Sequence, residues 1–275
     1  MSEPALEVRG LRHTFQPGGA NEMRALQGVD LALEPGTFVV VVGTNGSGKS
    51  TLLNAVAGTF VPDHGSVRVG GVDVTRTPEH VRARAIGRVF QDPLTGTAPH
   101  LTIAENLALA SQRAVGVRGL RRAVTRGARR ELAARVAALG MGLEGRLDVP
   151  LGSLSGGQRQ ALTLLMATLV RPVLLLLDEH TAALDPSSAA QVLRLTQEAI
   201  DRDSLTTLMV THSMQEAVRL GDRAIMMHQG RVVEDFSGPR KRRLRVTDLL
   251  DCFDQVRNAD RLDDSAAAML RREYV

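Results

Sequence analysis

Short apolar runs and longer segments with helical spacing alternate along most of the chain. The clearest run covers residues 38–42, where consecutive apolar residues are typical of a strand buried on both faces of a sheet. Shorter runs of the same kind, bounded by turn residues, predict further strands. These lie at residues 6–15, 26–33, 66–69, 72–74, 87–90, 173–177, 207–210 and 223–227.

Residues 101–139 differ from these runs, because they are rich in Ala, Leu and Arg and contain few β-branched stretches. We expect a helical subdomain here that ends near residues 140–145. Further helices are predicted at residues 51–57 and 156–169. Strands that alternate with helices in this way indicate an α/β fold with a largely parallel sheet.

Composition limits the size and the partners of the protein. Its 275 residues fit one large domain, or one domain with a subdomain and a short tail. Cys252 is the single cysteine, so no internal disulfide can form. The net charge is only +4, and nearly all the positive charge is arginine, a bias that genome composition can produce. We expect no nucleic-acid partner.

We expect neither a signal peptide nor a membrane-spanning helix. Residues 1–10 lack a basic head followed by an apolar run. The most apolar stretch, residues 161–177, is interrupted by Arg171 and Pro172 and is too short to cross a bilayer. A role in a membrane process would therefore require other chains.

A phosphate-binding loop is predicted at residues 43–50, which fit the pattern G-x-x-x-x-G-K-[ST] between a strand and a helix. Glycines let the backbone N–H groups face a phosphate at the start of the helix. Lys49 should reach the β- and γ-phosphates, and Ser50 should place its hydroxyl on Mg²⁺. A glycine-rich turn without a ligand is the alternative, and the complete pattern in this context disfavours it.

Two acidic residues follow the apolar residues 174–177. Asp178, at the end of this predicted strand, is suited to holding Mg²⁺. Glu179 is then placed to polarise a water for attack on the γ-phosphate. Acidic residues also cap strand ends by chance, but their position relative to the phosphate loop favours the catalytic interpretation.

Residues 154–160 read Leu-Ser-Gly-Gly-Gln-Arg-Gln and are the most informative stretch of the chain. With the phosphate loop and the acidic strand end, they resemble the ATP-binding cassette (ABC) family over residues 6–230. The resemblance implies an α/β P-loop NTPase of ABC type, with a mixed sheet core, an N-terminal antiparallel β part and an inserted α-helical subdomain. It also implies that residues 155–158 close over a nucleotide held by a second copy, so that ATP joins two chains.

The same resemblance assigns roles to single residues. Gln91 would link the Mg²⁺ site to a membrane partner, and His212 would contact the γ-phosphate. The implied catalytic residues are thus Glu179, His212, Gln91 and Lys49, and the implied Mg²⁺ ligands are Ser50, Gln91 and Asp178. Residues implied to contact ATP are Phe15 (stacked on the adenine), Thr44, Asn45, Gly46, Ser47, Gly48, Lys49, Ser50, Thr51, Ser155, Gly156, Gly157, Gln158 and Asp185 (in a loop that crosses the dimer interface).

His180 departs from the family pattern, because many relatives carry a proline after the catalytic glutamate. The carboxylate of Glu179 and the following Thr181 remain, so hydrolysis is not put in doubt. His180 could stiffen the loop or titrate near neutral pH. A purely structural role is the favoured interpretation.

Three functions compete. The first is the ATPase subunit of a membrane importer, at the cytoplasmic face of the inner membrane, with an integral-membrane permease, an extracytoplasmic substrate-binding protein and a second copy as partners. Residues 90–99 and 178–181 resemble the importer branch that includes tryptophan and tyrosine uptake systems. The second is a soluble mechanical ATPase, which is disfavoured because the chain has neither a long coiled coil nor two cassettes. The third is a soluble assembly factor.

The chain divides into an ATPase domain over residues 1–237, with the helical subdomain at about 92–170, and an extension over residues 238–275. The extension begins with a basic run at residues 239–245, for which a solvated linker is expected and a membrane-surface contact is the alternative. An amphipathic helix at residues 246–256 and a polar tail follow. The predicted apolar face of that helix consists of Leu249, Leu250, Phe253 and Val256.

Overall fold

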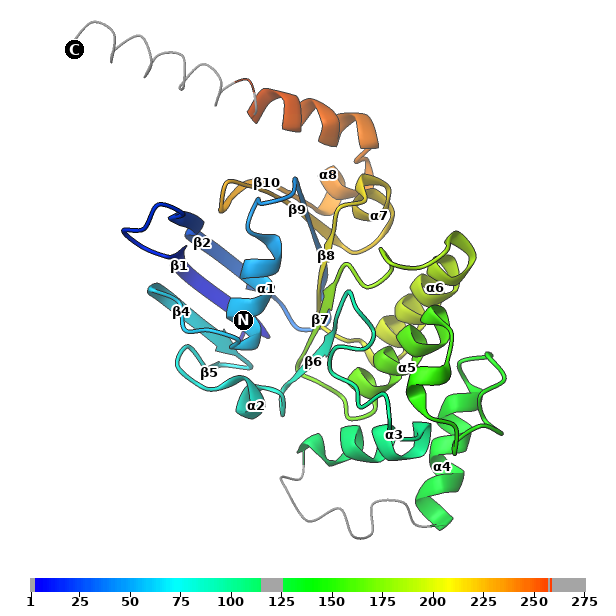
Figure 1. The fold of residues 1–275 in the computed structure, drawn as a ribbon. Coiled ribbons are helices and arrows are strands. Elements are labelled where there is room, and N and C mark those ends of the chain that lie inside the picture. The colour runs from blue at the N-terminus through cyan, green and yellow to red at the C-terminus, as the bar shows by residue number, and fades with distance from the viewer. Residues whose placement is uncertain (1–2, 115–125, 257, 259–275) are drawn as a thin grey trace, which may run out of the picture.

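The computed structural model describes residues 3–114, 126–256 and 258, and it contains two sheets (Figure 1). The smaller sheet is antiparallel, has the order β2-β1-β4-β5, and comprises β1 (Leu6–Phe15), β2 (Met23–Leu33), β4 (His64–Val69) and β5 (Val72–Asp73). The larger sheet has the order β10-β9-β3-β8-β7-β6, and only β10 runs antiparallel to its neighbour. Its strands are β3 (Phe38–Gly43), β6 (Ile86–Val89), β7 (Leu174–Asp178), β8 (Thr207–Thr211), β9 (Arg223–His228) and β10 (Arg231–Ser237).

Helices cover both faces of the larger sheet. Figure 1 shows α1 between the two sheets, while the long helices α5 and α6 lie on the opposite side of the larger sheet. The helices are α1 (Lys49–Ala57), α2 (Glu79–Arg82), α3 (Ile103–Ser111), α4 (Arg126–Ala137), α5 (Gly156–Thr168), α6 (Pro186–Asp203), α7 (Met214–Arg219), α8 (Gly238–Arg242) and a C-terminal helix at residues 246–256. Among the described residues, no helix combines the length and the hydrophobicity that a membrane crossing requires.

Strand β3 separates two hydrophobic cores, and every one of its residues is buried. Val39 and Val41 point towards α1 and the antiparallel sheet, whereas Val40 and Val42 point towards the helices on the other side. This is the alternation that a strand requires, because successive side chains point to opposite faces. A continuous valine run is therefore stable only as the central strand of this layered arrangement.

The fold expected from the resemblance is confirmed, and most predicted strands match within two or three residues. Among the described elements, α2, β10 and α8 had no clear signal in the sequence. Helix α2 is a single turn, β10 has no clear alternation in its burial, and α8 contains a Gly-Pro pair that usually marks a turn. The division of the chain at residue 237 stays a prediction.

The interpretation of residues 239–245 as solvated fits the exposed Arg240, Arg242, Arg243 and Arg245, but it is wrong for Lys241. Lys241 in α8 is buried and donates a hydrogen bond to the carbonyl oxygen of Val218, at 2.9 Å. In the C-terminal helix, Leu249 and Phe253 join the core on the helical side, while Leu250 is 46% exposed, so the apolar face is narrower than predicted. The predicted polar tail lies almost entirely outside the described residues.

Arg82 fixes the far end of α1, the helix that begins in the phosphate loop. Its buried guanidinium donates hydrogen bonds to the carbonyl oxygens of Ala55 and Val56 in the last turn of α1, each at 2.8 Å. It also binds the carbonyl oxygens of Thr75 and Thr77. These contacts satisfy carbonyls that the end of a helix leaves without partners.

We predict that Arg82→Ala lowers the free energy of unfolding by about 3 kcal/mol, because buried carbonyls of α1 then lack donors. Urea unfolding followed by circular dichroism measures the change. Arg84→Ala is the matched control, since Arg84 is exposed and close in sequence. Equal stabilities of the two variants would contradict this role of Arg82.

Candidate functional site

The candidate site lies where three neighbouring parallel strands end. Strand β8 pairs with β3 on one side and with β7 on the other, so the carboxyl ends of all three lie at one edge of the sheet. The phosphate loop follows β3, Glu179 follows β7, and His212 follows β8. Ligands of open α/β sheets bind at this edge.

Glycines allow the phosphate loop to pack closely against neighbouring backbone. Gly48, the residue before α1, has a φ of 97°, and a Cβ atom at this position would overlap the carbonyl oxygen of Ala25 in β2. A Cβ atom at Gly43 would come within 2.5 Å of the Ser47 hydroxyl oxygen. Thr44, Asn45 and Gly46 form the exposed crest of the loop.

Lys49 is buried at the start of α1, and its ammonium group is held by the loop itself. Nζ donates hydrogen bonds to the carbonyl oxygens of Gly43 and Thr44, at 2.9 and 3.1 Å. Burial lowers the pKa of Lys49, and the charges of Glu179 and Asp178 act in the opposite direction. The Lys49 ammonium group therefore lies within electrostatic range of both carboxylates.

The residues present fit a phosphate ligand and Mg²⁺. Among the described residues, the buried Ser47 hydroxyl has no hydrogen-bond partner, so a ligand oxygen at the loop would satisfy it. Ser50 Oγ lies 3.3 Å from Asp178 Oδ1, which brings together a hydroxyl and a carboxylate. Mg²⁺ in nucleotide sites typically takes one or two protein oxygens and completes its shell with water and phosphate.

Asp178 is partly buried at the end of β7. Burial raises the pKa of its carboxyl group, and the nearby guanidinium of Arg88 opposes that shift. Arg88 Nη2 lies 3.7 Å from Asp178 Oδ2.

Gln91, the third predicted metal ligand, is exposed. In the part of the chain that the structure describes, its side chain forms no hydrogen bond. Its role in the site stays a prediction.

Glu179 and His212 approach each other across β7 and β8. His212 Nδ1 lies 3.4 Å from Glu179 Oε2, with the imidazole 58% exposed and the carboxylate 18% exposed. Glu179 has a φ of 42°, a left-handed conformation that is strained for this residue type. Its backbone N–H donates to the carbonyl oxygen of Val210, and its carbonyl oxygen accepts from the N–H of Ala182.

The segment 155–158 forms the start of α5. Ser155 caps the helix, with reciprocal hydrogen bonds between its side chain and the N–H of Gln158 and between the Gln158 side chain and the N–H of Ser155. Gly156 and Gly157 pack against Leu184 and Ser188, where a side chain would not fit at Gly157. Within the described residues, no hydrogen bond joins this segment to residues 43–51.

Asp185 and Phe15, two further residues predicted to contact ATP, lie on other elements of the fold. Asp185 is exposed and caps α6 by accepting hydrogen bonds from the N–H groups of Ser187 and Ser188. Phe15 ends β1, is 36% exposed, and packs edge-on against His13. Its backbone pairs with Met23 in β2, and its ring also lies edge-on to Phe60, with 5.8 Å between the ring centres.

The possibility that His180 titrates near neutral pH is wrong. The ring is completely buried, and burial lowers its pKa to about 4. Its Nε2 atom lies 3.1 Å from Thr196 Oγ1 in α6. Because that hydroxyl donates to the carbonyl oxygen of Val192, it accepts from a neutral imidazole. His180 anchors the segment after Glu179 to α6.

Arg88 was not among the site residues predicted from the sequence. Besides its pairing with Asp178, its guanidinium binds the side-chain oxygen of Asn54 in α1 at 2.5 Å and lies 4.3 Å from the centre of the Phe90 ring. An arginine within a short, mostly buried strand, three positions before Gln91, is a signal that could have indicated a role in the site. Its partners, however, come from distant parts of the chain.

Comparison with known proteins agrees with this geometry. The sequence model described as ABC transporter matches residues 26–182. The chain belongs to the ABC transporter family. It is therefore the ATP-binding subunit of a transporter, and the nucleotide is ATP, which it hydrolyses.

Individual relatives cover nearly the whole cassette. The chain is 37% identical to the tyrosine transport ATP-binding protein of Clostridioides difficile, over 90% of this chain and 98% of that protein. It is 36% identical to the lipoprotein-releasing system ATP-binding protein LolD of Ruegeria pomeroyi, over 84% of this chain and 98% of that protein. The solved structure of the ATP-binding cassette MJ0796 with ADP and Pi, a dimer, superposes with a TM-score of 0.72 at 27% identity, covering 84% of this chain and 98% of that one.

We predict that Lys49→Ala lowers the affinity for ATP by roughly 10- to 100-fold, because it removes a charge-assisted contact to phosphate. Fluorescence titration with a labelled ATP analogue measures the dissociation constant. Lys241→Ala is the matched control, since Lys241 is the chain's other lysine and is buried beside α7. Wild-type affinity of Lys49→Ala would contradict the assigned role.

Proposed function

We propose that the chain energises a separate permease that imports a small solute such as an amino acid. The observation that carries this proposal is the 37% identity to a tyrosine transport ATP-binding protein over 98% of that protein's length. The proposed location is the cytoplasmic face of the membrane, where the cassette is peripheral. An extracytoplasmic substrate-binding protein completes the proposed system.

The proposed chemistry follows from the edge of the sheet. Lys49 and the N–H groups of the loop bind the β- and γ-phosphates, and Ser50 and Asp178, with Gln91, hold Mg²⁺. When bound, Mg²⁺ neutralises charge on the phosphate oxygens. Glu179 orients a water for in-line attack on the γ-phosphate, and His212 contacts that phosphate. The 3.4 Å separation between His212 and Glu179 supports a shared task.

We further propose that the complete site requires two copies packed head to tail. The start of α5 presents backbone N–H groups that suit a phosphate, yet no hydrogen bond of the described residues joins it to the loop of its own chain. A second copy would place its own residues 155–158 over the bound ATP. The dimeric cassette with ADP and Pi, to which this chain is similar, supports the arrangement.

The head-to-tail dimer has a direct test in the Glu179→Gln background, which is expected to retain ATP. We predict that Ser155→Asp abolishes the ATP-dependent dimer, because a carboxylate faces the phosphates while the helix cap is preserved. Ser155→Asn is the matched neutral control, and it should still dimerise. Light scattering with and without ATP gives the mass. A dimer that survives Ser155→Asp would refute this role of residues 155–158.

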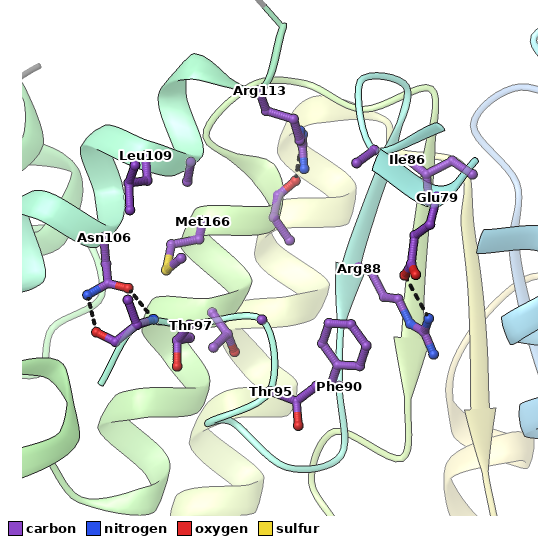
Figure 2. A pocket seen from close by; sticks show the side chains of 16 residues that line it. Glu79, Ile86, Arg88, Phe90, Thr95, Thr97, Asn106, Leu109, Arg113 and Met166 are labelled. Carbon is purple, nitrogen blue, oxygen red and sulfur yellow. Dashed lines mark hydrogen bonds and ion pairs between the residues drawn. The ribbon is translucent and has the colours of Figure 1, made fainter. Parts of the chain in front are cut away.

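A pocket beside the site is the proposed contact for the permease. It has a volume of about 450 Å³ and lies between α3, α5 and β6. Figure 2 shows Leu109, Met166 and Phe90 around it, with Arg113 and Arg88 at its edges. Residues 95–98 form one side of the pocket.

The pocket and the ATP site share Arg88. Its side chain lines the pocket, contacts the Phe90 ring, and lies 3.7 Å from Asp178. The Arg88 guanidinium also forms an ion pair with Glu79, with Nη1 3.5 Å from Glu79 Oε1, as the dashed line in Figure 2 shows. A permease helix inserted here would therefore touch a side chain that adjoins the proposed Mg²⁺ site, which gives a short path from docking to hydrolysis.

Affinity purification of the tagged chain from detergent-solubilised native membranes tests the proposal. We predict that a polytopic permease co-purifies with the wild-type chain and that Leu109→Glu abolishes this, because a carboxylate enters the apolar pocket. Leu250→Glu, on the exposed side of the C-terminal helix, is the control. Mass spectrometry identifies the partners. Recovery of soluble proteins alone would favour an assembly or mechanical ATPase instead, and a co-purifying substrate-binding protein would support import.

A further inference from the structure

Helix α7 begins with a Ser-x-x-Glu sequence whose hydrogen bonds differ from those of the usual capping box. Ser213 caps the helix, and Glu216 is the third helical residue, the arrangement in which a glutamate normally binds the N–H of the capping residue. Here the N–H of Ser213 donates instead to the hydroxyl of Thr211, at 3.0 Å. The Glu216 carboxylate is therefore available for other partners.

Those partners are two threonines that flank the Glu179–His212 pair. Thr211 Oγ1 donates to Glu216 Oε2 at 2.6 Å, and Thr181 Oγ1 donates to Glu216 Oε1 at 3.3 Å. Thr211 directly precedes His212, and Thr181 follows Glu179 by two residues. Both threonines are buried. One carboxylate thus joins the ends of β7 and β8 beyond their last backbone pairing.

We propose that Glu216 is a positioning residue for ATP hydrolysis, which holds the loops of Glu179 and His212 at their observed separation. This inference rests on the catalytic roles proposed for that pair. Glu179 has a strained backbone, and such a conformation persists only when its surroundings hold it. Thr181, two residues further on, is where Glu216 supplies that restraint, while the bond to Thr211 fixes the turn that carries His212.

The first test compares Glu216→Gln with Glu198→Gln. An amide offers only one acceptor oxygen, so the bridge loses one of its two threonines. We expect kcat for ATP to fall about tenfold while KM stays within about twofold of the wild type, since the phosphate loop is untouched. Glu198 is exposed on α6, paired with Arg194, and its variant should keep wild-type kinetics. Unchanged kcat in Glu216→Gln would overturn the inference.

A second comparison separates positioning from general stability. In a His212→Ala background, Glu216→Gln should reduce the single-turnover rate by less than about twofold, because the pair that it aligns no longer exists. The same tenfold loss in both backgrounds would show a merely structural role. If His212→Ala and Glu179→Gln themselves retain wild-type rates, the proposed catalytic roles fail; if they are impaired and Glu216→Gln is not, only the present inference fails.

Thr181 provides an independent test should the Glu216 variant fold poorly. Thr181→Val keeps the shape of the side chain and removes the hydroxyl, whereas Thr181→Ser keeps the hydroxyl. We expect Val to lower kcat several-fold and Ser to restore most of it. Equal rates in the two variants would contradict the bridge.

Discussion

The parallel pairing of β3 with β8 and of β8 with β7 is the constraint on which the rest of the structure depends. It places the phosphate loop, Glu179 and His212 at the same edge of one sheet, although they are separated by up to 169 positions in the sequence (212 − 43). The pairing is stabilised from both faces, because the alternating valines of β3 belong to two separate cores. Buried apolar contacts therefore fix the relative positions of the phosphate loop, Glu179 and His212.

Electrostatics at this edge follow from the same layering. Lys49, Asp178 and Arg88 are removed from water to different extents, and burial disfavours the charged form of each one. The attraction of Lys49 and of Arg88 to Asp178 compensates for part of that cost. The arrangement leaves a cluster of charges without a rigid salt-bridge lattice, since Lys49 is held by carbonyl oxygens and Arg88 lies 3.7 Å from Asp178.

Much of the fold could be predicted from the sequence, because its main strands are uninterrupted apolar runs and its phosphate loop has a fixed pattern. The positions of Lys49, Ser50 and Asp178 follow from that pattern once the strands are known. Lys241 shows where such reasoning ends: its burial against Val218 depends on how α8 packs, and a basic run alone indicates a solvated segment. Arg88 and Glu216 were missed for the same reason, since their partners are brought together only by the tertiary structure.

At the edge formed by β3, β8 and β7, we propose that ATP is hydrolysed through Glu179. The most direct measurement is the rate of phosphate release by Glu179→Gln beside its affinity for ATP. We predict an affinity close to that of the wild type and a rate reduced by at least about a hundredfold, because the amide cannot accept a proton from water. Near-normal phosphate release by this variant would show that Glu179 is not the catalytic residue.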